Sequence, residues 1–303
     1  MRNEQSQGYI KVFIAGLLWG TIGIWATLLG RMGMGSMMTA FFRLLTATVL
    51  LFFILIVKGK GFRLFKISKK GLISCILIGF LSQALYNYFY MYAVQTTGMS
   101  VAAVLLYTSP IFVAILSRMI LKENMTKNKI IAIAVNIVGC VLTVTGGSFA
   151  GANINMTGII MGVLAGFTYG LMPILSRIGA DDEEAYTSSF YGLAFGALLL
   201  FFMAHPYTGV DFEFTPQMIL VLIGFGLIPS ALGYIVYFGG LGQITETSKV
   251  PVFCSVENVA AAAFGFIIFH ESFTALKVIG IALVFCSIVI MNTKNKASSA
   301  QNQ

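Results

Sequence analysis

Long stretches without a charged side chain alternate with short polar segments along the whole chain. Residues 71–117 and 130–176 contain no Asp, Glu, Lys or Arg. Each stretch is more than twice as long as the roughly 20 residues that one helix needs to cross a bilayer. Because the apolar runs do not alternate strictly, they predict transmembrane helices and not barrel strands. Ten spans fit the pattern, at residues 10–29, 37–57, 71–93, 100–121, 129–146, 157–177, 185–205, 216–241, 249–269 and 274–292.

Composition and charge support a membrane protein and give it an orientation. Of the 303 residues, 58% are hydrophobic and 10% are charged, and the mean hydropathy of +0.89 lies far above that of soluble globular chains. The net charge of +8 does not indicate nucleic-acid binding, because the basic residues gather in short loops. With a cytoplasmic N-terminus, sixteen Lys and Arg fall inside and two, Arg31 and Lys277, fall outside. The positive-inside rule therefore predicts that both termini are cytoplasmic, with residues 293–303 as a disordered tail.

The two halves of the chain repeat the same residue types at a nearly constant offset, of 146 residues at first and of 148 residues later. Five spans per copy is an odd number, so the copies must cross the membrane in opposite orientations. The sequence therefore predicts an all-α integral membrane protein of two inverted five-helix repeats, residues 10–146 and 157–292, which is typical of secondary carriers. The matching pairs are Gly16/Gly162, Gly20/Gly166, Arg31/Arg177, Ser82/Ser230, Tyr86/Tyr234, Gln95/Gln243, Ser100/Ser248 and Glu123/Glu271.

Two charged residues lie inside predicted spans, Arg43 in the second and Glu257 in the ninth. A charge at mid-membrane costs at least about 2.5–3.5 kcal/mol, so it usually faces a cavity or a partner. We expect both residues to line the transport route and to contact a charged or zwitterionic substrate, and Glu257 is the candidate carrier of a coupled proton. For Arg43 a structural role is equally open, because it lies near the end of its span and can snorkel or fix helix packing.

Polar and aromatic side chains follow one face of the third predicted span. Four of them, between residues 83 and 90, have helical spacing, which suits a solvated cavity that binds rings or amines by stacking and cation–π contact. The alternative is an aromatic belt at the membrane interface, but the stripe is too long for a belt alone. Trp19 and Trp25 suit core packing as well as substrate contact. The candidate substrate-binding residues are Arg43, Gln83, Tyr86, Asn87, Tyr90, Tyr107, Tyr169, Tyr234, Glu257 and Asn258.

Other conspicuous residues have structural interpretations. Glu123 and Glu271 each precede a threonine, Thr126 or Thr274, that can cap the next helix, and a carboxylate there suits the helix dipole. The four cysteines fall in apolar segments without metal-site spacing and are interpreted as small core residues. Prolines that can form hinges in helices are Pro110, Pro173, Pro229 and Pro251.

Several short motifs occur in order along both halves. They are Leu18-Trp19-Gly20, Arg43 in Phe41-Phe42-Arg43-Leu44-Leu45, Ser109-Pro110, Leu121-Lys122-Glu123, Glu257 and His270-Glu271. Their order and spacing resemble the EamA-like transporters of the drug/metabolite transporter superfamily, over residues 10–292. The resemblance implies ten spans, an inverted repeat and a small polar or amphipathic metabolite as cargo. Asn258 departs from that pattern, since the family usually carries a proline after this glutamate.

No residues form a familiar catalytic arrangement. The two histidines, His205 and His270, have no zinc spacing, and the chain shows no nucleophile elbow, P-loop or complete dinucleotide fingerprint. We therefore expect a protein that is not an enzyme, with no cofactor and no bound metal. Without a nucleotide-binding domain in this chain, the energy for transport must come from a gradient.

The sequence thus favours a secondary carrier in the cytoplasmic membrane that exports a small metabolite or amphipathic compound by alternating access. Its expected partners are a small-molecule substrate, the lipid bilayer and protons as the candidate coupling ion; nucleic acid is not expected, and no pattern assigns an oligomeric state. An uptake permease and a facilitator or exchanger for a small amine or amino acid stay open as alternatives. A channel, or a membrane scaffold or enzyme, is less favoured, because no charged ring and no ionisable cluster at one membrane face is visible.

Overall fold

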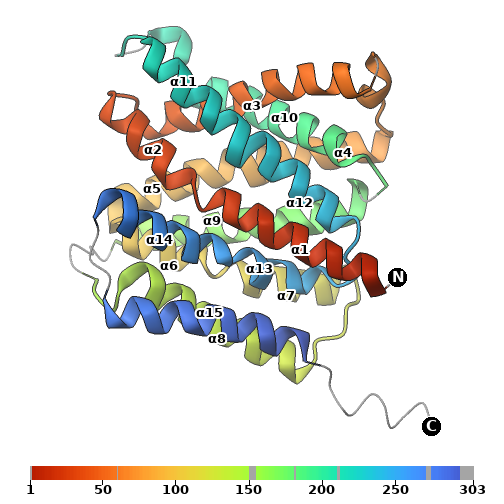
Figure 1. Ribbon diagram of the computed structural model, residues 1–303, viewed down its shortest axis with the longest axis vertical. Coiled ribbons are helices and arrows are strands. Elements are labelled where there is room, and N and C mark those ends of the chain that lie inside the picture. Colours follow the sequence, from red (N-terminus) through yellow and green to blue (C-terminus); the bar gives the residue numbers. More distant parts are fainter. Residues whose placement is uncertain are drawn as a thin grey trace.

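The computed structural model of the protein describes residues 2–59, 61–149, 155–180, 182–209, 212–270 and 274–293. Every regular element within these residues is a helix, which confirms the predicted all-α class (Figure 1). Ten helical segments are long and apolar enough to cross a membrane, and each overlaps one predicted span. The break expected near residues 95–98 occurs at Gly98, which has a φ of +88°. Glu271 and the predicted tail after Thr293 lie outside the described residues.

Several spans consist of two consecutive helices. Numbered 1 to 10 in chain order, the spans contain α1 (Arg2–Trp19) and α2 (Ile22–Arg31); α3 (Ser36–Lys58); α4 (Lys69–Leu77) and α5 (Tyr86–Thr97); α6 (Met99–Leu106) and α7 (Ser109–Met119); α8 (Lys127–Thr145); α9 (Met156–Leu175); α10 (Ala185–Ala204); α11 (Pro216–Phe225) and α12 (Gly233–Leu241); α13 (Val250–Cys254) and α14 (Val256–Phe269); and α15 (Ala275–Asn292).

The two halves pack against each other reciprocally. Span 1 packs on span 8 through α1 and α12, and its repeat equivalent, span 6, packs on span 3 through α9 and α5. Spans 2 and 7 pack on each other through α3 and α10, as do spans 5 and 10 through α8 and α15 (Figure 1). Exchanging the two halves leaves this pattern unchanged, as expected for two copies of one five-helix unit. Each half therefore completes the core of the other.

Glycines bring spans 1 and 6 close to spans 9 and 4. A Cβ atom on Gly16 would lie 2.7 Å from the carbonyl oxygen of Cys254 in span 9. Its repeat equivalent Gly162, and Gly166 one turn later, meet span 4 in the same way, with a Cβ on Gly166 only 3.0 Å from the carbonyl oxygen of Leu105. No side chain larger than hydrogen fits without a shift, so these glycines allow the close backbone approach.

Spans 3, 4, 8 and 9 are interrupted near the centre of the bundle. Spans 3 and 8 contain π-helical segments at Ile78–Leu85 and Gly226–Leu232. Span 4 breaks between α6 and α7, just before Pro110, and span 9 breaks at Ser255 between α13 and α14. The break in span 9 forms without a proline at position 258, so this family departure does not remove the interruption. Interrupted spans of this kind are common at the substrate sites of carriers.

One end of the bundle carries the connections after α3, α7 and α12 together with both ends of the described chain (Figure 1). We call it the basic end, because most Lys and Arg residues lie there. Thr126 caps α8 there, as expected, and Thr274 caps α15 at the other end. Glu123 makes structural contacts, but its hydrogen bonds reach beyond the helix that follows it: the carboxylate accepts from the backbone N–H groups of Thr247 and Ser248 in the second half.

The outer surface of the bundle is apolar. Large side chains such as Val57, Leu220 and Ile267 are 65–79% exposed, which suits contact with lipid and not with water. Cys75, Cys140 and Cys254 are buried as predicted, whereas Cys286 is exposed on this surface. The chain is therefore a multi-pass membrane protein.

Candidate functional site

A cavity of about 490 Å³ lies between the two halves and opens at the end opposite to the basic end. We call it the central cavity. Its mouth is lined by residues at the ends of spans 1, 2 and 4, among them Gly30, Ser36 and Met99. Polar and aromatic side chains from both halves gather in its deeper part. These side chains are Trp19, Arg43, Tyr86, Asn87, Tyr90, Tyr169, Phe225, Tyr234 and Glu257.

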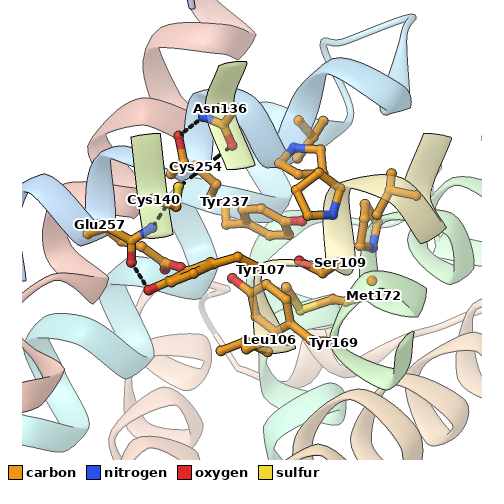
Figure 2. A pocket seen from close by; sticks show the side chains of 18 residues that line it. Leu106, Tyr107, Ser109, Asn136, Cys140, Tyr169, Met172, Tyr237, Cys254 and Glu257 are labelled. Carbon is orange, nitrogen blue, oxygen red and sulfur yellow. Dashed lines mark hydrogen bonds between the residues drawn. The ribbon is translucent and has the colours of Figure 1, made fainter. Parts of the chain in front are cut away.

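A second, much narrower cavity of about 30 Å³, which we call the lower cavity, lies next to the central cavity on the side of the basic end. Figure 2 shows the side chains that line it. Leu106, Tyr169 and Glu257 line both cavities, so they form the boundary between them. The lower cavity holds about one water molecule. The path is therefore open from one end as far as Glu257 and closed beyond it. The other polar or sulfur-containing side chains of the lower cavity are Tyr107, Ser109, Asn136, Cys140, Met172, Tyr237, Cys254, Ser255 and Asn258.

Glu257 lies in the first turn of α14, directly after the break at Ser255. The positive end of the helix dipole favours a carboxylate at this position. Within the described residues the carboxylate forms no hydrogen bond or ion pair. Gly20 lets span 1 reach the same turn, because a Cβ there would lie 2.9 Å from the carbonyl oxygen of Glu257. A carboxylate held in this way can bind a cationic group or exchange a proton.

Arg43 lies on the wall contributed by the first half. Its side chain is only 6% exposed, seven residues into α3 and about 10 Å along the helix from its start. The guanidinium stands over the ring of Phe225, 5.6 Å from its centroid, and lines the central cavity. Arg43 therefore does not snorkel to the end of the bundle. A packing contact and a substrate contact are both compatible with this position.

Two tyrosines lie near both charges. Tyr86 in span 3 and its repeat equivalent Tyr234 in span 8 are each within electrostatic range of both Arg43 and Glu257. The ring of Tyr86 lies 5.3 Å from that of Tyr169, and the ring of Tyr234 lies 5.2 Å from that of Trp19. The repeat thus contributes matching aromatic rings from spans 3 and 8 to the lining of the cavity, where they can hold the body of a ligand by stacking.

Gln83 is the one candidate residue that lies behind the wall and not on it. It lines neither cavity and is 1% exposed. Its Oε1 accepts a 2.9 Å hydrogen bond from the hydroxyl of Tyr234, and its backbone carbonyl accepts a 2.5 Å bond from Nδ2 of Asn87. Tyr234 and Asn87 both line the central cavity. Gln83 therefore positions Tyr234 and Asn87.

A chain of polar contacts joins four spans around the lower cavity, and Figure 2 shows the part of it that lines the cavity. The hydroxyl of Tyr107 donates to Oδ1 of Asn258, whose Nδ2 lies 3.3 Å from Sγ of Cys140. Nδ2 of Asn136 donates to the hydroxyls of Ser255, at 2.6 Å, and Ser287, at 3.0 Å. Tyr107 and Asn258 belong to different halves, so their bond crosses the boundary beside Glu257. Satisfied polar groups of this kind hold helices together in an apolar surrounding.

Sequence reasoning did not select Phe225, Asn136, Cys140 or Cys254 as site residues. Asn136 carries a readable signal, because it is an amide in the middle of a mostly apolar span 5. Phe225 and the two cysteines carry none, since apolar and thiol side chains are ordinary in a membrane helix. Across the part of the chain that the structure describes, no three His, Cys, Asp or Glu residues cluster as a metal site.

Comparison with known proteins finds relatives along the whole chain. The sequence model of the EamA-like transporter family matches residues 6–145 and 156–293. The uncharacterized transporter YoaV of Bacillus subtilis is 27% identical over 281 residues, which cover 91% of this chain and 93% of YoaV. The uncharacterized inner membrane transporter YicL of Salmonella typhimurium is 22% identical over 96% of each chain. A solved crystal structure of 14% identity has the same fold, with a TM-score of 0.80 over 95% of this chain and 98% of that chain.

Proposed function

Because the chain belongs to the EamA-like transporter family, we propose that it is a secondary carrier that moves a small metabolite or amphipathic compound by alternating access. The observation that carries the proposal is the central cavity, which is built by both halves, open at one end and closed below Glu257. Two repeats of opposite orientation can form two states of similar energy, one open to each side. This structure has the features of one of those states.

The lining of the central cavity indicates the chemistry of the cargo. Arg43 offers a cation on one half, Glu257 offers a carboxylate on the other, and aromatic rings line the same cavity. A cavity of about 490 Å³ is in the range that binds small molecules. A zwitterionic or amine-bearing compound with an apolar or aromatic body would satisfy all three features. Arg43, Tyr86, Asn87, Tyr90, Tyr107, Tyr169, Tyr234, Glu257 and Asn258 are the proposed binding residues, with Gln83 behind them.

We place the basic end in the cytoplasm, following the positive-inside rule. The central cavity then opens to the outside, and Glu257 lies where a proton can enter from that side. Net export of substrate in exchange for an entering proton follows from these two assignments. The cytoplasmic membrane is the proposed location, because a proton gradient is available there.

Transport by the purified full-length protein in proteoliposomes tests the proposal. The panel comprises amino acids, amines, nucleosides and cationic dyes, with and without an imposed proton gradient. We expect saturable transport that responds to the gradient and is lost in Glu257→Gln. Glu213→Gln, an exposed glutamate at the opposite end from the basic end, is the matched control and should transport normally.

Three other outcomes would change the assignment. Saturable transport that ignores the gradient indicates a facilitator or exchanger. Accumulation in the opposite direction indicates an uptake permease. Wild-type rates in both Glu257→Gln and Tyr86→Ala, with normal folding and insertion, would show that the central cavity is not the substrate site.

A further inference from the structure

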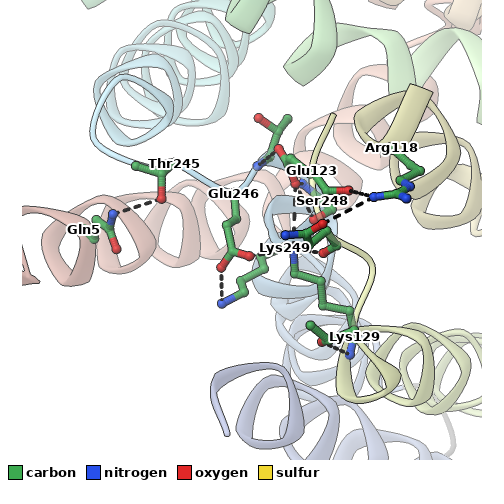
Figure 3. A network of polar contacts seen from close by, with 11 residues as sticks. Gln5, Arg118, Glu123, Lys129, Thr245, Glu246, Ser248 and Lys249 are labelled. Carbon is green, nitrogen blue, oxygen red and sulfur yellow. Dashed lines mark hydrogen bonds and ion pairs between the residues drawn. The ribbon is translucent and has the colours of Figure 1, made fainter. Parts of the chain in front are cut away.

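Between the lower cavity and the basic end, a compact set of polar contacts joins the two halves (Figure 3). Glu123, in the connection between α7 and α8, accepts hydrogen bonds from the backbone N–H of Thr247 at 2.6 Å and of Ser248 at 3.1 Å. The Ser248 hydroxyl donates a third bond, of 2.6 Å, to the same carboxylate. One carboxylate of the first half thus holds the start of span 9 in the second half.

Ion pairs reinforce this contact. Nζ of Lys129, in the first turn of α8, lies 2.6 Å from Glu246 of the second half and 3.9 Å from Glu123. Lys249 lies 2.5 Å from the other oxygen of Glu246. The Lys129 side chain is buried, so its charge depends on these partners. Hydrogen bonds to ionised groups are stronger than those between neutral groups.

The contact acts on a short helix that leads directly to the site. Thr247 and Ser248 precede α13, and α13 ends at the break at Ser255, two residues before Glu257. Val250, Pro251 and Cys254 of α13 line the lower cavity. Helix α13 is therefore held at the basic end by Glu123 and interrupted at Ser255. Movement of α13 away from α7 would open the lower cavity to the basic end.

We propose that Glu123, with Lys129 and Glu246, is the latch that closes the basic end of the carrier, and that its release exposes Glu257 to that side. The inference rests on the proposed function, since it assumes that the basic end opens during transport. Glu123 then takes part in the exchange between the two open states, and its hydrogen bonds to span 9 break when the basic end opens.

The test uses the native cysteines of the full-length protein in nanodiscs, where both ends are accessible. Cys254 lines the lower cavity but not the central cavity, so a bulky, membrane-impermeant maleimide reaches it when the basic end opens. Peptide mass spectrometry follows each cysteine separately. Cys75 is buried between spans 3 and 7, where its thiol contacts the carbonyl of Ser188, and it reports general loosening of the bundle.

We expect Glu123→Gln to raise the modification rate of Cys254 by about tenfold or more, since it weakens bonds to a charged group. Ser248→Ala removes one of the three bonds and should give a smaller increase; it also serves if Glu123→Gln folds poorly. The control Glu213→Gln should leave the rate unchanged. Equal rates for Cys254 in wild type, Glu123→Gln and Ser248→Ala would overturn the latch, as would a parallel rise at Cys75.

This measurement needs no substrate and therefore separates the two proposals. Unchanged Cys254 modification together with normal transport would remove the latch and leave the carrier. Faster Cys254 modification in a protein that transports no compound of the panel would support the latch and count against the proposed cargo class.

Discussion

The hydroxyl of Tyr234 in span 8 donates a 2.9 Å hydrogen bond to Oε1 of Gln83 in span 3, across the boundary between the two repeats. Both side chains are buried, and Tyr234 lines the central cavity while Gln83 does not. The bond therefore orients the Tyr234 ring in the cavity wall through a residue that does not itself line the cavity. The repeat does not duplicate it, because position 231, which is equivalent to Gln83, is an alanine.

We predict that Gln83→Leu destabilises the protein by about 1–3 kcal/mol, because it leaves the Tyr234 hydroxyl buried without its acceptor. It should also raise the KM for the transported substrate, since the ring loses its orientation. The double variant Gln83→Leu/Tyr234→Phe removes both polar partners and should unfold closer to wild type than the two single variants suggest. Thermal unfolding of all four proteins measures the coupling, and strictly additive losses would show that the bond contributes nothing.

Substitution of Arg43 separates its two interpretations. Arg43→Lys keeps the charge but loses the planar guanidinium that stands over Phe225 and can bind a carboxylate with two hydrogen bonds. If Arg43 contacts the substrate, KM should rise by about tenfold or more while the melting temperature hardly changes. If Arg43 only packs the helices, the melting temperature should fall and KM should stay constant. Arg43→Gln is expected to give the larger change of the same kind.

The close packing of span 1 on span 9 at Gly16 leads to a prediction about stability. Gly16→Ala places a methyl group 2.7 Å from the carbonyl oxygen of Cys254 and from a side-chain carbon of Val256. Overpacking of this kind costs about 1–3 kcal/mol, and the melting temperature of the purified protein should fall accordingly. Gly192→Ala is the matched control, because its nearest neighbour would lie at an ordinary 3.6 Å. Equal melting temperatures for the two variants would contradict the tight packing of span 1 on span 9.

The helical spans could be predicted from the sequence because length and the absence of charge decide them locally. The cavity charges Arg43 and Glu257 could be singled out for the same reason, since a charge in an apolar span needs a special place. The position of Gln83 could not be predicted in this way. Its spacing from Tyr86 and Asn87 suits one face of an α-helix, but the π-helical segment Ile78–Leu85 changes the residues per turn and directs Gln83 elsewhere.

Glu123 shows a second limit of local reasoning. The sequence correctly indicates that a carboxylate at this place suits a helix N-terminus. The backbone N–H that it accepts from belongs to Thr247, 124 residues later in the chain and just before α13, and no local pattern contains that information. The repeat alignment does not supply it either, because it pairs Glu123 with Glu271 and Ser248 with Ser100 but says nothing about contacts between the pairs.

The ionisation of Glu246 gives a prediction with a definite sign. Burial raises the pKa of Glu246, but hydrogen bonds from Lys129 and Lys249 outweigh it and hold the pKa below its usual range. Tyr9 and Glu123 also lie close to this cluster. A carboxylate whose pKa is lowered by folding stabilises the protein fully above its unfolded pKa, and this stabilisation is lost as the pH falls through the folded pKa.

The difference in melting temperature between wild type and Glu246→Gln should therefore be constant from about pH 5.5 to 8 and shrink below about pH 4.5. Glu213→Gln should show no such difference at any pH. A difference that already shrinks between pH 8 and 6 would mean that another group controls the closure of the basic end.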